Sequence, residues 1–141
     1  MLHFQLVSTK GVKFDDDAYE VLIPTKAGTI ALFEDHMPLI SAGAPGTISI
    51  RKKLGDSDGS MEHFAVSGGV IQVDGKSAKF LSDEVTTSEE VNEQEAEAAL
   101  ARAKELVKNA SGQVALHEAK QMLHHSSAQL NVAKFKKRHH R

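Results

Sequence analysis

The 141-residue chain is long enough for one domain, or for a compact domain with an appendage, and its 40% apolar residues can form a core. It has no cysteine, which excludes disulfides, thiolate catalysis and cysteine-bound zinc. The net charge of −2 argues against a nucleic-acid binder. The sequence has no signal-peptide pattern and no apolar run of the roughly 20 residues that span a bilayer. We therefore expect a soluble cytoplasmic protein.

Short strands dominate the sequence up to residue 85, where all three prolines and nine of the ten glycines also lie. Residues 2–7 alternate, with Leu2, Phe4 and Leu6 on one face. Similar stretches follow between Gly, Pro, Asp and Ser residues, at 18–23, 28–33, 46–50, 62–66, 69–73 and 77–81. Closely spaced strands with no helical period between them predict an antiparallel β-sandwich.

The sequence changes to a helical period from residue 86. Thr86 with Glu89, and Thr87 with Glu90, form capping-box patterns that predict a helix start. Two apolar stripes then recur at spacings of three and four, separated by a turn at 109–112: Ala96, Leu100, Ala103, Val107, Ala110, and Leu116, Ala119, Leu123, Ser126, Leu130, Ala133. The predicted fold class is α+β, with an antiparallel sandwich at residues 1–85 and an antiparallel two-helix hairpin at 86–141.

The seam of this hairpin is predicted to be weak. Large residues alternate with Ala or Ser, and each Ala in place of Leu forgoes roughly 2 kcal/mol of burial. The first helix begins with glutamates and the second ends with Lys134, Lys136, Lys137, Arg138 and Arg141. The hairpin brings these ends together, but exposed ion pairs add only about 0–1 kcal/mol each. We therefore expect a hairpin that can open.

Glu34, Asp35 and His36 are the first candidates for an acid/base or metal site. Successive residues on an extended segment point to opposite faces, so these three cannot converge without a tight turn. No second cluster at metal-ligand spacing appears in the sequence. We interpret the segment as a polar turn at a strand end, displayed at the surface, with Gly43 and Gly46 allowing its turns.

Other polar motifs do not assemble a site either. Gly68 and Gly69 precede a strand, whereas a phosphate loop needs a helix N-terminus. His117, His124 and His125 lack the four-residue spacing that places two imidazoles on one helix face, so they are interpreted as a solvated polar face. The basic tail is interpreted as a frayed helix end, or as a contact for an acidic protein surface. No catalytic, metal or cofactor site is predicted.

Several short motifs, in this order, carry a resemblance to the epsilon subunit of bacterial F-type ATP synthases (the delta subunit in mitochondria). They are Ile23 and Pro24, Gly28, the run His36, Met37, Pro38 and Leu39, the pair Pro45 and Gly46, and the run Ser67, Gly68 and Gly69. One departure is Ala31, which stands where the family has a second glycine in the early turn. The resemblance covers essentially the whole chain, including the order of sandwich and hairpin.

This resemblance implies a ten-stranded sandwich with a two-helix domain, and a non-catalytic subunit of the central stalk. Its partners would be the rotating gamma subunit and the membrane c-ring, so that proton flow is coupled to ATP synthesis. The chain would lie on the cytoplasmic face of the bacterial inner membrane, attached only through the complex. Glu34, Asp35 and His36 would lie at the c-ring contact.

The resemblance also implies a regulatory arm. The hairpin would alternate between a folded state and an extended state that reaches the alpha/beta catalytic head and blocks ATP hydrolysis. Lys134, Lys136, Lys137 and Arg138 would then meet acidic residues of the catalytic subunits.

Some members of this family bind ATP through an Ile/Leu-Asp-x-x-Arg-Ala motif at the start of the first helix. Here Asn92 replaces the aspartate and Glu95 replaces the arginine, and the Glu95 charge would repel a phosphate. We therefore expect weak or absent ATP binding in a calorimetric titration. The alternative to a stalk subunit is a free-standing β-sandwich binding module whose helical arm covers an exposed sheet edge.

Overall fold

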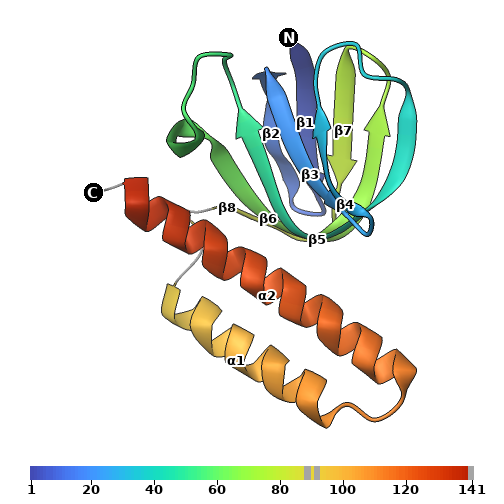
Figure 1. Cartoon of the computed structure of the whole chain (residues 1–141), viewed down its shortest axis with the longest axis vertical. Coiled ribbons are helices and arrows are strands. Elements are labelled where there is room, and N and C mark those ends of the chain that lie inside the picture. The colour runs from blue at the N-terminus through green and yellow to red at the C-terminus, as the bar shows by residue number, and fades with distance from the viewer. Residues whose placement is uncertain (88–89, 91–92, 140–141) are drawn as a thin grey trace.

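In the part of the chain that the structure describes, eight strands form a β-sandwich, and two long helices form a hairpin that packs against it (Figure 1). The computed structural model describes residues 1–87, 90 and 93–139, without the side chains of 135–139. The elements are β1 (Leu2–Ser8), β2 (Gly11–Ala18), β3 (Glu20–Thr25), β4 (Gly28–Leu32), β5 (Leu39–Arg51), a 3₁₀ turn (Asp58–Ser60), β6 (Glu62–Val73), β7 (Ser77–Leu81), β8 (Val85–Thr87), α1 (Glu93–Asn109) and α2 (Gln113–His139). The predicted sandwich followed by a hairpin is confirmed.

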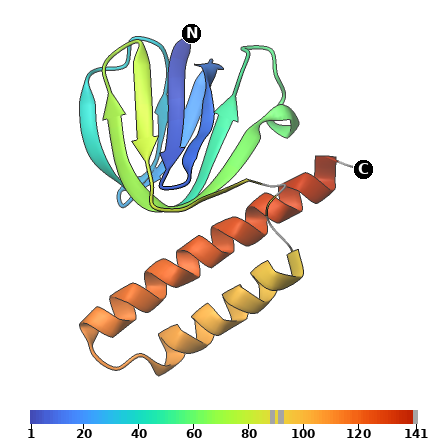
Figure 2. The same ribbon diagram turned by 180° about the vertical axis from the view of Figure 1, so that it is seen from behind.

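The strands form one sheet in the order β2-β1-β7-β6-β5-β3-β4, with β8 paired to β6. The long strands β5 and β6 bend and pass through both layers of the sandwich (Figure 2). One layer contains β2, β1 and β7 together with the C-terminal half of β6 and the N-terminal half of β5. The other layer contains β4, β3 and β8 together with the C-terminal half of β5 and the N-terminal half of β6. Pairing is antiparallel as predicted, except that β1 and β7 run parallel.

Glycines at the bend explain why fewer strands form than the motifs implied. Gly43 pairs with Gly69, and a Cβ on Gly43 would lie 2.5 Å from a ring carbon of Phe80. A Cβ on Gly69 would overlap the carbonyl oxygen of Leu81. The prediction that Gly43 and Gly46 allow turns is wrong, because both lie inside β5, where the side chains of Phe80 and Pro24 approach them closely. The stretches 62–66 and 69–73 likewise form one strand, β6.

The core fills the space between the two layers. In β1 the predicted alternation is confirmed, because Leu2, Phe4 and Leu6 are all fully buried. Phe4 packs against Phe14 with ring centroids 6.1 Å apart, and Phe14 packs edge-on against Phe64 at 6.0 Å. Close packing of this core holds the two layers in fixed positions relative to each other. The side chains on their outer faces therefore also have fixed relative positions.

The hairpin has the predicted seam but a later start. Thr87 lies in β8, its N–H donates to the Glu90 carboxylate (3.4 Å), and α1 as described begins at Glu93. The seam positions between the helices are buried or half-buried, as predicted: Ala96, Leu100, Ala103, Val107, Leu116, Ala119, Leu123, Ser126, Leu130 and Ala133. Gly112 in the connecting turn has a φ of 89°, which glycine adopts without strain.

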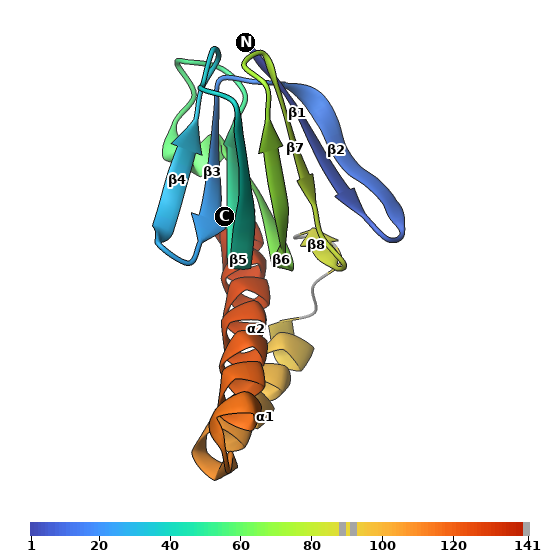
Figure 3. The ribbon, with the colours of Figure 1, turned by 90° about the vertical axis from the view of Figure 1, so that its right-hand side faces the viewer.

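Helix α2 also packs on the sandwich, which the sequence did not predict. It lies along β5 and β6 (Figure 3), where Ala128 and Val132 form a buried cluster with Ala65 of β6. Ala65 points away from the core because its neighbours Phe64 and Val66 point into it. The helix therefore covers a sheet face, rather than the sheet edge that the alternative function assumed.

Candidate functional site

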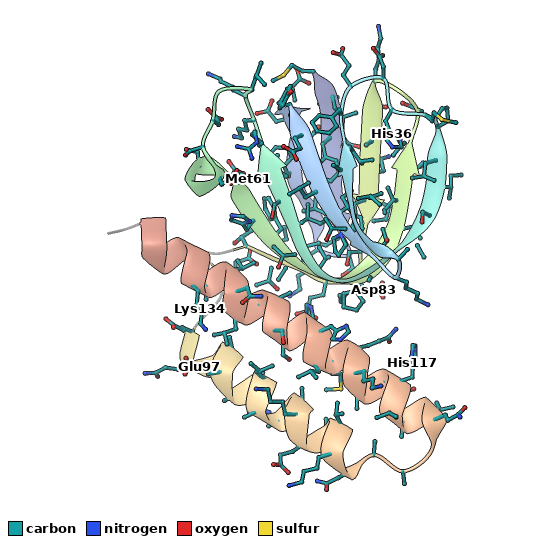
Figure 4. All side chains as sticks on the ribbon, viewed as in Figure 1. His36, Met61, Asp83, Glu97, His117 and Lys134 are labelled. Atoms are coloured by element: carbon teal, nitrogen blue, oxygen red, sulfur yellow. The ribbon has the colours of Figure 1, made fainter. Side chains whose placement is uncertain are left out.

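The loop that carries residues 34–36 lies at the end of the sandwich away from the hairpin (Figure 4). The Glu34 carboxylate is 3.0 Å from the Met1 amino group. Asp35 adopts a φ of 64°, and its N–H donates to the Gly75 carbonyl at 2.9 Å. His36 contacts the Met37 carbonyl oxygen through Nδ1 at 2.8 Å. The Glu34 and His36 side chains thus have separate partners, the Asp35 contact is made by its backbone, and the three residues do not share a partner.

Metal or acid/base chemistry therefore finds no support in this loop. Within the described residues, no group of three or more His, Cys, Asp or Glu side chains has the arrangement that holds a metal ion. Glu34 and Asp35 are exposed and His36 is half-exposed. The loop is suited to surface contact, and its assignment to a particular partner stays a prediction.

A continuous row of apolar side chains crosses the outer face of the layer that contains β1. The strand register places Val12, Val7, Leu81, Val70 and Ala42 side by side on β2, β1, β7, β6 and β5. Exposure is 57% for Val12, 43% for Leu81 and 46% for Val70, so the row is open to solvent. We call these five residues the apolar row.

Polar residues border the apolar row toward the N-terminal end of the sandwich. The polar residues next across the strands are Asp15, Gln5, Lys79 and Gln72, and they are followed on β5 by the apolar Ile40, which is 75% exposed. An open cavity of about 690 Å³ lies over this part of the face. An exposed apolar strip with a polar rim is typical of a protein-binding surface.

His3 forms a charged network at the edge of the same face. Its Nδ1 lies 3.0 Å from Asp17 Oδ1, and its Nε2 lies 2.6 Å from Asp15 Oδ1. The hydrogen bonds to Asp17 and then Asp15 raise the pKa of His3 above its ordinary value of 6.5. His3 therefore keeps its positive charge to higher pH than a free histidine and partly neutralises the acidic strand β2.

Pairs of adjacent apolar residues, which interrupt the alternation of a strand, were the sequence signal for the apolar row. Val70 stands next to Ile71, and Leu81 next to Phe80, so two apolar residues follow one another in each strand. Because neighbours in a strand point to opposite faces, such a pair places one apolar side chain outside the core. Reading these pairs together with strand order reveals the row, and strand order is not available from the sequence.

The predicted basic tail lies at the end of α2. Lys134 is exposed, and Figure 4 shows it at the same end of the hairpin as Glu97. Lys136, Lys137 and Arg138 belong to the α2 backbone, and their side chains lie outside the described part. The role of these residues stays a prediction.

One position of the degenerate ATP motif, Glu95, borders a cavity of about 440 Å³ between α1, α2 and β8. Asn92 lies outside the described residues, whereas Glu95 is exposed and lines the cavity with Glu90, Arg102 and Gln129. Arg102 is a cation that the sequence interpretation did not consider. Two carboxylates line the cavity beside this guanidinium, and they disfavour a polyphosphate. Weak ATP binding stays a prediction.

The helical histidines divide into two groups. His117 and His124 are exposed, as the solvated polar face predicted. For His125 that prediction is wrong, because its side chain is only 16% exposed between α2 and the sandwich. Its Nε2 lies 3.5 Å from Glu84 Oε2 and 3.3 Å from Gln129 Nε2. The cause is the docking of α2 on the sheet, which the spacing of histidines does not reveal.

Comparison with known proteins gives matches over nearly the whole chain. Residues 1–88 match the family model "ATP synthase, Delta/Epsilon chain, beta-sandwich domain", and residues 89–134 match "ATP synthase, Delta/Epsilon chain, long alpha-helix domain". The ATP synthase epsilon chain of Dichelobacter nodosus is 33% identical over 107 residues, covering 76% of this chain and 72% of the relative. That of Polaromonas naphthalenivorans is 34% identical over 109 residues, covering 77% and 76%.

Solved structures share the fold at lower identity. A chain in the mitochondrial ATP synthase of Euglena gracilis, in an assembly with the c-ring, aligns with a TM-score of 0.75 and 16% identity, covering 94% of this chain and 81% of that one. A chain in the central stalk and c-ring of the Tetrahymena thermophila mitochondrial enzyme gives 0.58 and 14%, covering 98% and 96%. Among the described residues, no helix is long and apolar enough to cross a bilayer. The chain belongs to the ATP synthase delta/epsilon chain family, and it is similar to bacterial epsilon chains over about three quarters of its length.

Proposed function

We propose that the chain is a non-catalytic central-stalk subunit of an F-type ATP synthase, which couples proton translocation through the c-ring to ATP synthesis. Family membership supports this assignment, and so does the apolar row, a broad protein-binding surface on a rigid sandwich. The chain would be peripheral on the cytoplasmic face of the bacterial inner membrane, attached only through its partners. The alternative of a free-standing module is not favoured.

The apolar row is the proposed contact for the gamma subunit. It runs across five strands, and its exposed valines and Leu81 would lose water on association, at about 25 cal/mol per Å² of apolar area. The polar rim, including the His3 network and Lys79, would set the orientation of the partner. A rotor subunit must not slip against its neighbour, and a rigid sheet face meets that requirement.

Residues 34–36 are the proposed contact for the c-ring. Glu34, Asp35 and His36 stand at the end of the sandwich opposite the hairpin, in a loop whose backbone is fixed by the Asp35 hydrogen bond to Gly75. The loop at residues 34–36 and the apolar row lie on different parts of the surface. The chain could therefore bind the c-ring and the gamma subunit at the same time.

Co-purification from solubilised membranes tests both contacts. The tagged chain is expected to retain gamma and c subunits together. A variant with Glu34, Asp35 and His36 replaced by alanine is expected to retain gamma and to lose c subunits at moderate salt. Retention of neither subunit by the unmodified chain would refute the proposed function. Full retention of c subunits by the triple variant would refute only the assignment of this loop.

We propose that residues 86–141 act as a regulatory arm and residues 1–85 as the stalk-binding unit. Helices α1 and α2 comprise 17 and 27 residues. Laid end to end at about 1.5 Å per residue they would reach roughly 65 Å, well beyond the length of either helix alone. The extended arm would reach the alpha/beta catalytic head, where Lys134, Lys136, Lys137 and Arg138 would meet acidic residues and inhibit ATP hydrolysis.

Removal of residues 111–141 tests the arm. The truncated chain keeps the apolar row and the 34–36 loop, so assembly with gamma and the c-ring is expected to be unchanged. ATP hydrolysis by the assembled enzyme is expected to rise several-fold, because the inhibitory helix is gone. Steady-state hydrolysis of purified enzyme with full-length and truncated chains measures the effect. Equal rates would refute an inhibitory role of the arm.

A further inference from the structure

Helix α2 contacts the sandwich along both β5 and β6, through apolar and polar side chains. The buried apolar cluster of this contact consists of Ala65, Ala128 and Val132, two of which are alanines. Beside it, Gln129 Nε2 donates to the Thr86 hydroxyl at 3.3 Å. Small side chains such as these bury less apolar surface than Leu or Phe would, so each contributes little to holding the helix.

His125 adds a polar group that the docked helix does not satisfy. Its Nδ1 is buried and has no hydrogen-bond partner among the described residues. Its Nε2 faces two groups with opposite demands, the Gln129 amide at 3.3 Å and the Glu84 carboxylate at 3.5 Å. The amide N–H needs an acceptor, whereas the carboxylate needs a donor.

Neither neutral form of the imidazole meets all of these demands. If Nε2 accepts from Gln129, the proton sits on Nδ1, where it has no acceptor. If Nε2 carries the proton and faces Glu84, then Nδ1 is an unfilled acceptor, and the Gln129 amide keeps only Thr86. Burial of a polar atom without a partner is unfavourable, and water supplies that partner once the helix leaves the sheet.

We propose that His125 is the release point of α2: its unpaired ring nitrogen keeps the docked helix only weakly favoured over the released one. Helix α1 packs against α2, and a cavity of about 440 Å³ lies between α1 and β8, so α1 is expected to move with α2. The hairpin therefore leaves the sandwich as a closed pair of helices. The bearing of this release on ATP hydrolysis rests on the proposed function, but the release itself is a property of the isolated chain.

Distances between spin labels on the full-length isolated chain test this inference. The chain has no cysteine, so labels attach only to cysteines introduced at exposed positions. Lys26→Cys with Lys120→Cys reports docking of α2, and Lys104→Cys with Lys120→Cys reports closure of the hairpin. Val132→Ala serves as the background, because loss of its buried methyl groups is expected to raise the released population about tenfold, into the measurable range.

His125→Leu in this background is expected to lower the ratio of released to docked helix by about five- to thirtyfold, since it fills the same space without an unpaired nitrogen. His124→Leu is the matched control, because His124 is the exposed neighbour on the same helix, and no shift is expected. An unchanged or higher released population with His125→Leu would overturn the proposal, as would an equal shift with His124→Leu. Separation of the two helices in step with release would overturn the closed-pair departure. None of these outcomes depends on assembly into an ATP synthase.

Discussion

Replacement of Leu81 with aspartate is expected to prevent stable assembly with the gamma subunit. Leu81 is the central member of the apolar row, between Val7 and Val70, so a partner that covers the row also covers this position. An unpaired carboxylate in a covered interface costs roughly 3–5 kcal/mol, which corresponds to a rise in Kd of about 150- to 4,000-fold. Leu81 is 43% exposed in the free chain, so the sandwich itself is expected to fold normally.

Leu54→Asp is the control variant for the Leu81→Asp measurement. Leu54 is 71% exposed in the loop between β5 and β6, outside the apolar row. Leu54→Asp makes the same chemical change, and its affinity for gamma is expected to stay within about twofold, since isolated surface changes are nearly neutral. Calorimetric titration of each variant with purified gamma subunit gives the two affinities. Equal affinities for the two variants would place the gamma contact elsewhere on the sandwich.

Gly69→Ala is expected to cost more than about 4 kcal/mol of folding free energy and to leave little folded sandwich. A methyl group at this position would overlap the carbonyl oxygen of Leu81, which is backbone and cannot rotate away. The site lies at the bend of β6, opposite Gly43 of β5, so relief of the overlap would pull apart strands that belong to both layers. Urea unfolding followed by circular dichroism measures the loss.

Gly55→Ala is the control for this experiment. A Cβ at Gly55 meets no atom within 4 Å, and the residue has no positive φ. Its unfolding free energy is expected to change by no more than about 0.5 kcal/mol. If Gly69→Ala unfolded at the same urea concentration as Gly55→Ala, the close approach of β6 to Leu81 would not be a real constraint on the fold.

The strand core and the helical seam were predictable because each rests on a simple period. Alternation in β1 placed Leu2, Phe4 and Leu6 inside, and spacings of three and four residues gave the seam. The bends in β5 and β6 were not predictable, because glycine and proline normally mark turns. At Gly43 and Gly69 the glycines instead allow two backbones and a ring to approach closely, and only the tertiary arrangement shows which neighbour is there.

The candidate contact surfaces were predictable in part. Residues 34–36 were expected to be displayed without forming a site, and the structure gives each of them a separate partner. The apolar row depends on strand order, in particular on the parallel pairing of β1 with β7, which no local pattern encodes. His125 was predicted to be solvated, but it is largely buried because α2 contacts both α1 and the sandwich. A helix with two buried faces has no clear polar side in its sequence pattern.

The sharing of β5 and β6 by both layers has a mechanical consequence. Ala42 and Val70 on the outer row are joined through unbroken strands to Thr47 and Ala65 beneath the helix, only five residues away in each case. Sliding of one layer over the other would have to stretch covalent backbone rather than shear a layer of side chains. The sandwich is therefore stiff against shear. A force applied to one face deforms the sandwich little and is transmitted to the other face.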